Sequence, residues 1–338
     1  MRRWAVVAGV SLACVSSAGQ ARAAESFFSE DGSTVTMATM RSPGLVKVDI
    51  KSGKVAKAPL PKELKGEFID SVARGGEGEA LFLAKDAVWV WKADATPPVK
   101  RVCATAPVVD ATDLFVDTRA DSPLKDTLFV SGSEKDDTSG RQVLFGRKPG
   151  GKAFMPVFCR RVEDARSGVF SSGGRFFFVA GGDVWEGGVS PDEDDSLERL
   201  GVLVGARLAP LGILNTDESN SGSMWVRQIA PVEDTLYIRM RGRHMGAILR
   251  IPLPTRPLYS PGSEEQPTLE AQLQAMRLSL AKAEVIEDGL EDAEAFCAAE
   301  LADSHRLFYC TRDEKGLAMR VLHGDAKPKV IGYLPEEP

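Results

Sequence analysis

Histidine is scarce in this sequence, and the short motifs of the common enzyme families are absent. Of 338 residues three are histidines, His244, His305 and His323, and no carboxylates near them have the spacing of a metal cage. The sequence contains no Gly-x-Ser-x-Gly elbow, no phosphate-binding loop and no dinucleotide-binding fingerprint. These absences favour a protein that is not an enzyme, so the sequence assigns no catalytic, cofactor-binding or metal-binding residue.

Basic clusters are also missing, and the chain has one apolar run of notable length. No group of lysines and arginines is dense enough to follow a nucleic-acid backbone, so nucleic acid is not an expected partner. The apolar run, Trp4 to Val15, is shorter than the roughly 20 residues of a membrane-spanning helix. It follows Arg2 and Arg3 and precedes Ala21-Arg22-Ala23, which is the arrangement of a cleaved signal peptide.

We therefore expect export to the periplasm or the cell exterior, with residues 1–23 removed. Cleavage leaves 39 basic and 48 acidic side chains, a formal charge of −9, which favours solubility. The alternative is a lipoprotein, because Leu12-Ala13-Cys14 resembles the motif before a lipid-modified cysteine. Ser11, however, stands where that motif has a branched apolar residue. No later segment predicts a membrane span, and the sequence gives no oligomeric state.

Four cysteines remain after cleavage, and an oxidising compartment favours their pairing. Cys297 and Cys310 flank an expected turn at 302–304, so we expect them to face each other across adjacent strands. Cys103 and Cys159 end neighbouring repeat units and form the second candidate pair. The alternative is that one or both pairs are free thiols that pack as small hydrophobic side chains.

A pattern of short strands recurs about every 46 residues. It begins with the Asp31-Gly32 turn, a strand to Ala38, a second strand at Gly44 to Ile50 and the Ser52-Gly53 turn. Comparable blocks cover Glu79–Trp91, Asp126–Phe145, Arg175–Trp185, Asp234–Ile251 and His305–Leu322. A period of about 40 to 50 residues with several strands per unit is typical of a β-propeller, in which each unit is one blade.

The repeat predicts a single all-β propeller domain over residues 24–338, with six blades and room for a seventh near Leu200 to Leu214. The six are expected at Glu25–Pro61, Phe68–Ala106, Val109–Arg160, Val162–Leu203, Leu211–Ile286 and Gly289–Leu334. The fifth is oversized because residues 255–281 form an insertion that follows a proline-rich segment.

The insertion predicts one helix near 268–281. Apolar residues recur there at helical spacing, and they form a stripe of Leu269, Leu273, Met276 and Leu280. Thr268 is the expected N-cap. We expect this helix to pack on its own blade; the alternative is that it covers the side of the propeller or folds over one face.

Other prominent residues are interpreted as structural. Trp89, Trp91 and Trp185 lie in expected third strands, where aromatic residues pack one blade on the next, rather than forming a quinone-cofactor or sugar platform. The acidic stretches at 192–195 and 217–222 are interpreted as solvated turns, with calcium binding as the alternative. The innermost strands, such as those at 68–72 and 225–229, are expected to line a central channel with small and apolar residues.

The segment Phe28 to Val35 followed by Gly44 to Ile50 resembles the WD40-like repeat of the TolB-type periplasmic β-propellers. In that repeat an Asp-Gly turn opens a strand, and an apolar strand ending in Asp-x-x-x-Gly closes the hairpin. The resemblance covers residues 28–53, and it implies a propeller that presents loops to a partner without supplying catalytic residues or a cofactor.

The sequence thus predicts an exported, non-enzymatic propeller that binds a protein or cell-envelope partner through loops on one face. Two alternatives remain open. One is a propeller that binds or hydrolyses a small molecule or glycan at its central channel. The other is a structural component of an envelope assembly. A propeller fold hosts all three functions, so the repeat alone does not choose among them.

Overall fold

The structure of the protein is a computed structural model. It describes residues 26–38, 44–76, 78–134, 143–159, 165–171, 174–191, 199–209, 211, 224–242, 246–259, 267–290, 294–301, 304–324 and 326–335. The predicted signal peptide with Cys14, the acidic stretches at 192–195 and 217–222, and His244 lie outside these residues.

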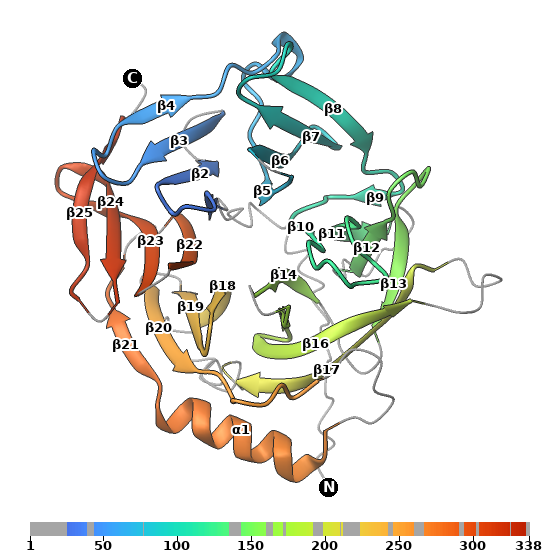
Figure 1. Ribbon diagram of the computed structural model, residues 1–338, viewed down its shortest axis with the longest axis vertical. Coiled ribbons are helices and arrows are strands. Elements are labelled where there is room, and N and C mark those ends of the chain that lie inside the picture. Colours follow the sequence, from blue (N-terminus) through green and yellow to red (C-terminus); the bar gives the residue numbers. More distant parts are fainter. Residues whose placement is uncertain are drawn as a thin grey trace, which may run out of the picture.

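The chain forms small antiparallel sheets arranged in a ring around a central axis (Figure 1). The first unit contains β1 (Ser26–Phe28), β2 (Thr34–Ala38), β3 (Leu45–Asp49) and β4 (Val55–Lys57). The second contains β5 (Ser71–Arg74), β6 (Glu79–Ala84), β7 (Ala87–Lys92) and β8 (Val99–Ala104). The third contains β10 (Leu114–Val116), β11 (Leu128–Glu134), β12 (Val143–Arg147) and β13 (Met155–Cys159).

The remaining units follow the same order, from the inner strand outward. The fourth contains β14 (Arg166–Phe170), β15 (Phe176–Ala180), β16 (Asp183–Pro191) and β17 (Gly201–Ala209). The fifth contains β18 (Met224–Val232), β19 (Thr235–Gly242), β20 (Gly246–Pro252) and β21 (Glu284–Glu287). The sixth contains β22 (Glu294–Leu301), β23 (Ser304–Asp313), β24 (Gly316–His323) and β25 (Lys329–Leu334). A further short strand, β9 (Val108–Val109), pairs with β11 in the sheet of the third unit, while the 3-10 turn η1 (Lys62–Leu64) and the helix α1 (Leu269–Ala281) lie outside the sheets.

The described strands therefore group into six four-stranded units, and the predicted all-β propeller is confirmed. The segment that left room for a seventh blade contains β17, which is the outer strand of the fourth unit. This strand ends at Ala209, six residues beyond the predicted end of that blade.

The second and fourth units show how the repeated sequence builds equivalent packing. The indole Nε1 of Trp89 donates to the carbonyl oxygen of Ala84 at 3.0 Å, and that of Trp185 donates to Ala180 at 3.2 Å. Each indole ring also stacks on a phenylalanine of the preceding strand. Both tryptophans belong to the hydrophobic core between units, as the sequence interpretation expected.

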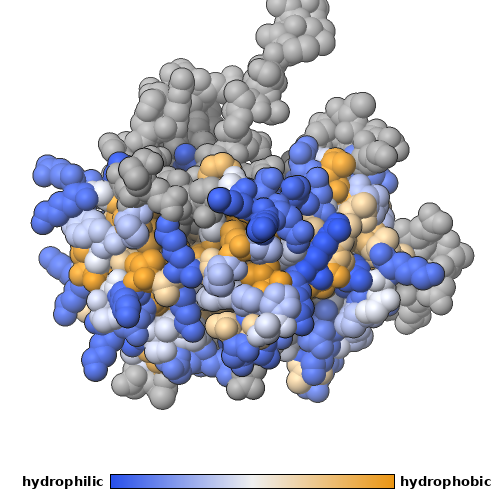
Figure 2. Space-filling model, turned by 90° about the horizontal axis from the view of Figure 1, so that it is seen from above, coloured by the Kyte–Doolittle hydropathy of each residue, from blue (hydrophilic) through white to orange (hydrophobic). Residues whose placement is uncertain are grey.

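The hydrophobic core is divided among the joints between neighbouring units. Six clusters of buried residues are present, and each contains side chains from two adjacent units. Burial of apolar area at about 25 cal/mol per Å² is the main force that holds one unit against the next. The side of the ring seen in Figure 2 carries many hydrophilic residues, with hydrophobic residues showing between them.

Two joints differ in how they are made. At the joint between the third and fourth units, the paired joint, β13 and β17 form a parallel ladder from Val157 opposite Gly201 to Cys159 opposite Leu203. These units thus share one nine-stranded sheet. At the joint between the sixth and first units, the closing joint, no strand pairing is present among the described residues, and side chains alone close the ring.

The helix begins where the sequence predicted, but it buries a different face. Thr268 accepts a hydrogen bond from the amide of Ala271 at 3.2 Å, which confirms the N-cap. The leucines of the predicted stripe are exposed: Leu269 by 71%, Leu273 by 42% and Leu280 by 48%. The apolar stripe is therefore not the face that packs on the sheets, although the helix does contact its own blade at β20, as well as β17 of the fourth unit.

The buried face of the helix is made of small residues that allow close contact with β17. Ala275 and Ser279 are buried, and the Ser279 hydroxyl donates to the carbonyl oxygen of Leu208 at 3.0 Å. A leucine at either position would hold the helix further from the strand. The helix thus lies along the outside of the ring against the fourth and fifth units (Figure 1).

Candidate functional site

The innermost strands of all six units surround a central cavity of about 400 Å³. Each unit begins with its inner strand, so these strands run in the same direction along the axis and end at the same face. The lining residues come from both ends of these strands and from the turns that follow them. We take this cavity as the candidate functional site, because concave sites with a few convergent polar groups are the usual places for ligands.

Phenylalanine rings form one wall of the cavity. Phe115 and Phe170 lie with ring centroids 6.3 Å apart, and Phe170 lies 4.7 Å from Phe176. Gly168, between them, has no room for a side chain, since a Cβ atom there would lie 2.5 Å from the Phe115 ring. The wall is therefore fixed by close packing, and it offers an apolar surface to whatever enters the cavity.

Three consecutive inner strands, β14, β18 and β22, carry a β-bulge near their starts, at Ser167, Arg227 and Ala295. Ser167 has φ of +52°, a strained conformation for a residue other than glycine. Its hydroxyl lies 3.3 Å from Asp113 Oδ1 and 3.4 Å from the Arg227 carbonyl oxygen. The bulges thus place polar groups on the cavity near the starts of these inner strands.

A buried pair of polar side chains lies next to the bulge in β18. Gln228 lines the cavity, and its Oε1 accepts a hydrogen bond from Arg239 Nη1 at 2.7 Å. Both residues are nearly inaccessible to solvent, which makes the bond important for keeping the guanidinium in the core. We infer that this pair fixes the shape of the wall.

Charged residues surround the mouth of the cavity where the inner strands end. Glu30 and Arg74 form an ion pair between the first and second units, and Glu300 of the sixth unit is exposed nearby on the lining. The side chains of the pair are 71% and 40% exposed, so the pair contributes little to stability. Its charges remain available to a partner.

On the same face, Arg119 ties the third unit to the fourth. Its guanidinium lies 4.5 Å from the centroid of the Phe170 ring and donates two hydrogen bonds to Asp117, at 2.8 and 2.6 Å. Burial raises the pKa of Asp117, but the hydrogen bonds from Arg119 and Ser122 outweigh burial and hold this pKa below its usual range. This carboxylate is therefore ionised at neutral pH.

The chemistry of the lining differs from the sequence expectation. The phenylalanine, valine and alanine residues agree with the small and apolar lining that was predicted, but Glu30, Arg74, Asp113 and Glu300 contradict it. Among the described residues, one trio of His, Cys, Asp or Glu side chains has its donor atoms close together. This trio, Glu233, Asp234 and His305, does not line the cavity.

The sequence analysis did not identify these lining residues, although a repeated pattern in the sequence marks several of their positions. Aligning the units on their first strands places a polar residue at or just after the end of each strand, as at Arg74, Thr118 and Ser171. Residues at equivalent ends of inner strands converge on one mouth. The polar pair Asp113 and Ser167 carries no such signal, because a bulge creates it.

The four described cysteines are free thiols in this structure. The ladder places Cys297 opposite Phe308 rather than opposite Cys310, so these two cysteines are diagonal neighbours. Diagonal neighbours lie about 7–8 Å apart, further than a disulfide allows. Burial raises the pKa of the Cys297 thiol to about 12.

Cys103 and Cys159 pack in different joints. Cys103 contacts the cluster between the second and third units, and Cys159 contacts the cluster between the third and fourth. The third unit thus stands between them. The geometry favours the alternative interpretation, free thiols that act as small hydrophobic residues, and a mass spectrum of the unreduced protein tests both predicted bonds.

No family model and no curated protein matches this sequence. Among similar solved structures, a putative TolB from Agrobacterium tumefaciens is 10% identical with a TM-score of 0.50, over 84% of this chain and 86% of that one. The calcium-binding protein regucalcin from Agrobacterium tumefaciens is 13% identical with a TM-score of 0.50, over 93% of both chains.

A third similar structure is the extracellular domain of a putative one-component system from B. thetaiotaomicron. It is 10% identical with a TM-score of 0.46, over 93% of this chain and 33% of that one, so this chain spans about a third of its length. At such identities, the two likenesses with a TM-score of 0.50 establish the fold alone. TolB-type and other β-propellers are the structures that this chain is similar to.

Proposed function

We propose that this chain is an exported, non-enzymatic β-propeller that binds a protein or cell-envelope partner at the mouth of its central cavity. The observation that carries the proposal is the composition of that mouth. An apolar wall around Phe170 lies inside, and the exposed charges of Glu30, Arg74 and Glu300 lie at the rim. Protein interfaces combine an apolar centre with a polar rim in the same way.

The proposed partner inserts a short loop or chain end. An apolar side chain of that segment contacts the phenylalanine wall, and its charged groups meet the carboxylates and the guanidinium at the rim. The turns that follow β1, β10 and β14 supply the rest of the contact, on one face of the ring. Export rests on the predicted signal peptide; among the described residues no helix has the length and apolarity needed to cross a membrane.

A selection from a random peptide library tests the proposal. The full chain after signal-peptide removal is immobilised, and recovered peptides are measured by calorimetry against the wild type and against Ala299→Trp. Ala299 lines the cavity and is half-buried, so a tryptophan fills the mouth. We expect at least tenfold weaker binding to this variant, and also to the charge reversal Glu300→Lys.

Val102→Trp is the matched control, because Val102 is 41% exposed on β8, at the outer edge of its unit. Peptides that bind all four proteins equally would place the interface elsewhere and overturn the proposal. N-terminal sequencing of exported protein tests the export part of the proposal, and a mature chain beginning at or near Ala24 is expected.

The second candidate function is binding of a small molecule or glycan in the same cavity. A volume of about 400 Å³ is within the range of small-molecule sites, roughly 300–1,000 Å³, and favours this candidate. A screen of sugars and metabolites by thermal shift distinguishes the two. Ligands that stabilise the wild type and not Ala299→Trp, with no peptide recovered, would favour the small molecule over the protein partner.

A further inference from the structure

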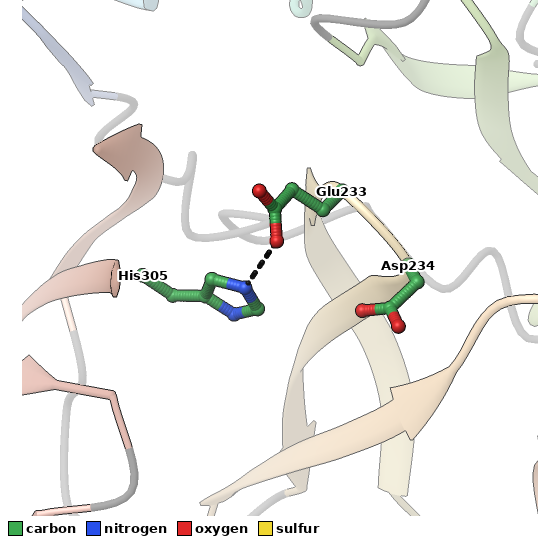
Figure 3. Close-up of side chains that lie close together, drawn as sticks. All are labelled: Glu233, Asp234 and His305. Carbon is green, nitrogen blue, oxygen red and sulfur yellow. Dashed lines mark hydrogen bonds and ion pairs between the residues drawn. The ribbon is translucent and has the colours of Figure 1, made fainter. Parts of the chain in front are cut away.

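Three side chains of types that can ligate a metal lie close together at the ends of strands in the fifth and sixth units, outside the cavity (Figure 3). Glu233 and Asp234 form the two-residue turn between β18 and β19, and His305 is the second residue of β23. One donor atom from each side chain lies within 4.8 Å of the other two. In the part of the chain that the structure describes, this trio stands alone.

Backbone hydrogen bonds hold both sides of this group in place. The carbonyl oxygen of Asp234 accepts from the amide of Leu253 at 2.6 Å, and that of His305 accepts from Gly324 at 2.8 Å. Glu233 has φ of +46°, a conformation that a glutamate rarely adopts. The turn therefore presents two consecutive carboxylates toward the imidazole of the next unit.

The distances suit a small cation. His305 Nε2 lies 3.0 Å from Glu233 Oε2. Two ligand atoms at the usual zinc distance of about 2.1 Å in tetrahedral geometry lie about 3.4 Å apart. The Glu233 side chain is 50% exposed and Asp234 is exposed, so both can rotate to bring the carboxylate oxygens to such a distance.

We propose that Glu233, Asp234 and His305 bind a divalent cation of the zinc class, with one imidazole and two carboxylate ligands. An imidazole ligand favours zinc, cobalt or nickel over calcium and magnesium, which prefer oxygen ligands alone. Three protein ligands leave a coordination position open, as in zinc sites that also bind water or an external ligand.

The surroundings give access to that open position. His305 also lines a groove of about 460 Å³ between the fifth and sixth units, together with Thr235, Arg250 and Lys282. Glu284 lines the same groove and accepts hydrogen bonds from Arg250 at 3.1 and 2.6 Å, so the Arg250 charge is already paired. Lys282 is therefore the basic side chain of the groove that complements an anion, such as a carboxylate, on the bound cation. The cation would also connect two neighbouring units, because two of its ligands come from the fifth unit and one from the sixth.

Calorimetry on the full chain after signal-peptide removal, without a histidine tag and after treatment with chelator, tests the site. Titration with zinc chloride should reveal one site per chain, and His305→Ala should weaken it at least tenfold. Cobalt chloride gives a second measurement, since a cobalt-bound site absorbs visible light and the variant should lose this band. Zinc should raise the melting temperature of the wild type by a few degrees, because a ligand that binds only the folded state stabilises it.

His323→Ala is the matched control, because His323 is an exposed histidine of the same unit that lies outside the trio. Glu233→Gln keeps the size of the side chain and removes a ligand charge, so it tests the site if His305→Ala fails to fold. Zinc binding that is equal in wild type, His305→Ala and Glu233→Gln would overturn the proposal. Equal affinity for calcium and zinc would also overturn it. Neither result bears on binding at the cavity.

Discussion

The paired joint and the closing joint solve the same packing problem in different ways. Between the third and fourth units, backbone hydrogen bonds connect β13 to β17, and a further bond joins Leu200 to Pro156 at 2.9 Å. Between the sixth and first units, fourteen buried residues pack without any strand pairing among the described residues. The ring is thus closed by surface complementarity, while another joint is fused into one sheet.

This difference indicates at which joint between units local unfolding should begin. A hydrogen-bonded ladder separates only when several backbone groups lose their partners together. A packed interface separates when its apolar area becomes exposed, and units that contact only neighbours open most easily at their weakest joint. Four other joints also lack a ladder among the described residues, but consecutive units on either side of each are connected along the chain, whereas the sixth and first units are not consecutive. We therefore expect the closing joint to open first and the paired joint to open with the whole fold.

The largest expected effect comes from removing a buried ring at each joint. Phe308→Ala at the closing joint and Phe178→Ala at the paired joint each remove a fully buried side chain, so each should lower the free energy of unfolding by about 3–5 kcal/mol. Urea titration measures both losses. Hydrogen exchange should accelerate at moderate urea across the first and sixth units in Phe308→Ala, and Phe178→Ala should open no unit early. Early opening in both variants would contradict the comparison.

A glycine substitution tests the fit of the closing joint. Gly53 has φ of +67°, and a Cβ atom there would lie 2.2 Å from the carbonyl oxygen of Ile331. Gly53→Ala should therefore cost about 2–4 kcal/mol, from backbone strain and from separation of the two units. Gly150→Ala is the control, since Gly150 has φ of +73° and nothing within 4 Å. It should cost about 1–2 kcal/mol, the strain alone. Equal losses of unfolding free energy in the two variants would mean that the Ile331 carbonyl moves away from the added methyl group at little cost.

Acid should weaken the polar contact beside the paired joint. The pKa of Asp117 is lower in the folded protein than in the unfolded chain, where it is about 3.9. Its contribution is therefore complete above about pH 5, and it decreases as the pH falls toward and through the folded-state value. Asp117→Asn should lose about 1–2 kcal/mol at pH 7, and this difference should shrink below pH 3. Thermal unfolding of both proteins from pH 2 to 7 measures it, and a difference independent of pH would exclude Asp117 ionisation as its source.

The smallest expected effect is on thiol reactivity at the closing joint. Cys297 and Cys310 are buried in that joint, so iodoacetamide reaches them only when it opens. Gly53→Ala should raise their labelling rates at least tenfold at constant pH, and Gly150→Ala should change them little. Mass spectrometry of each labelled peptide gives the rates. Unchanged rates in Gly53→Ala would show that opening does not pass through this joint.

The repeat predicted most strands to within a few residues, because strands and their turns are local. The first predicted strand ends at Ala38 in the structure as well, and the strand predicted at Gly44 to Ile50 is β3, Leu45–Asp49. The buried face of the helix is not its apolar stripe, because periodicity marks an apolar stripe but not the strand on which a helix packs. Small residues at Ala275 and Ser279 decided the contact instead.

The candidate sites were less predictable than the fold. Glu233 and His305 are 72 residues apart, and only the arrangement of two turns on neighbouring units brings them together. The pairing of β13 with β17 is equally non-local, since nothing in the sequence of either strand indicates which strand it pairs with. A single sequence records the composition of each unit but not which residues of different units meet at the axis or the rim.

The closing joint has a consequence for the order of the chain. The first unit consists of residues 26–57 and the sixth of residues 294–334, so every four-stranded unit is one continuous stretch of sequence. Cutting the chain between any two units therefore divides no unit. A circular permutant that begins at the second unit and joins the sixth to the first through a short linker should form the same ring. Its closing joint would carry a covalent connection. The joint between the first and second units, where the permuted chain is cut, would become the weakest.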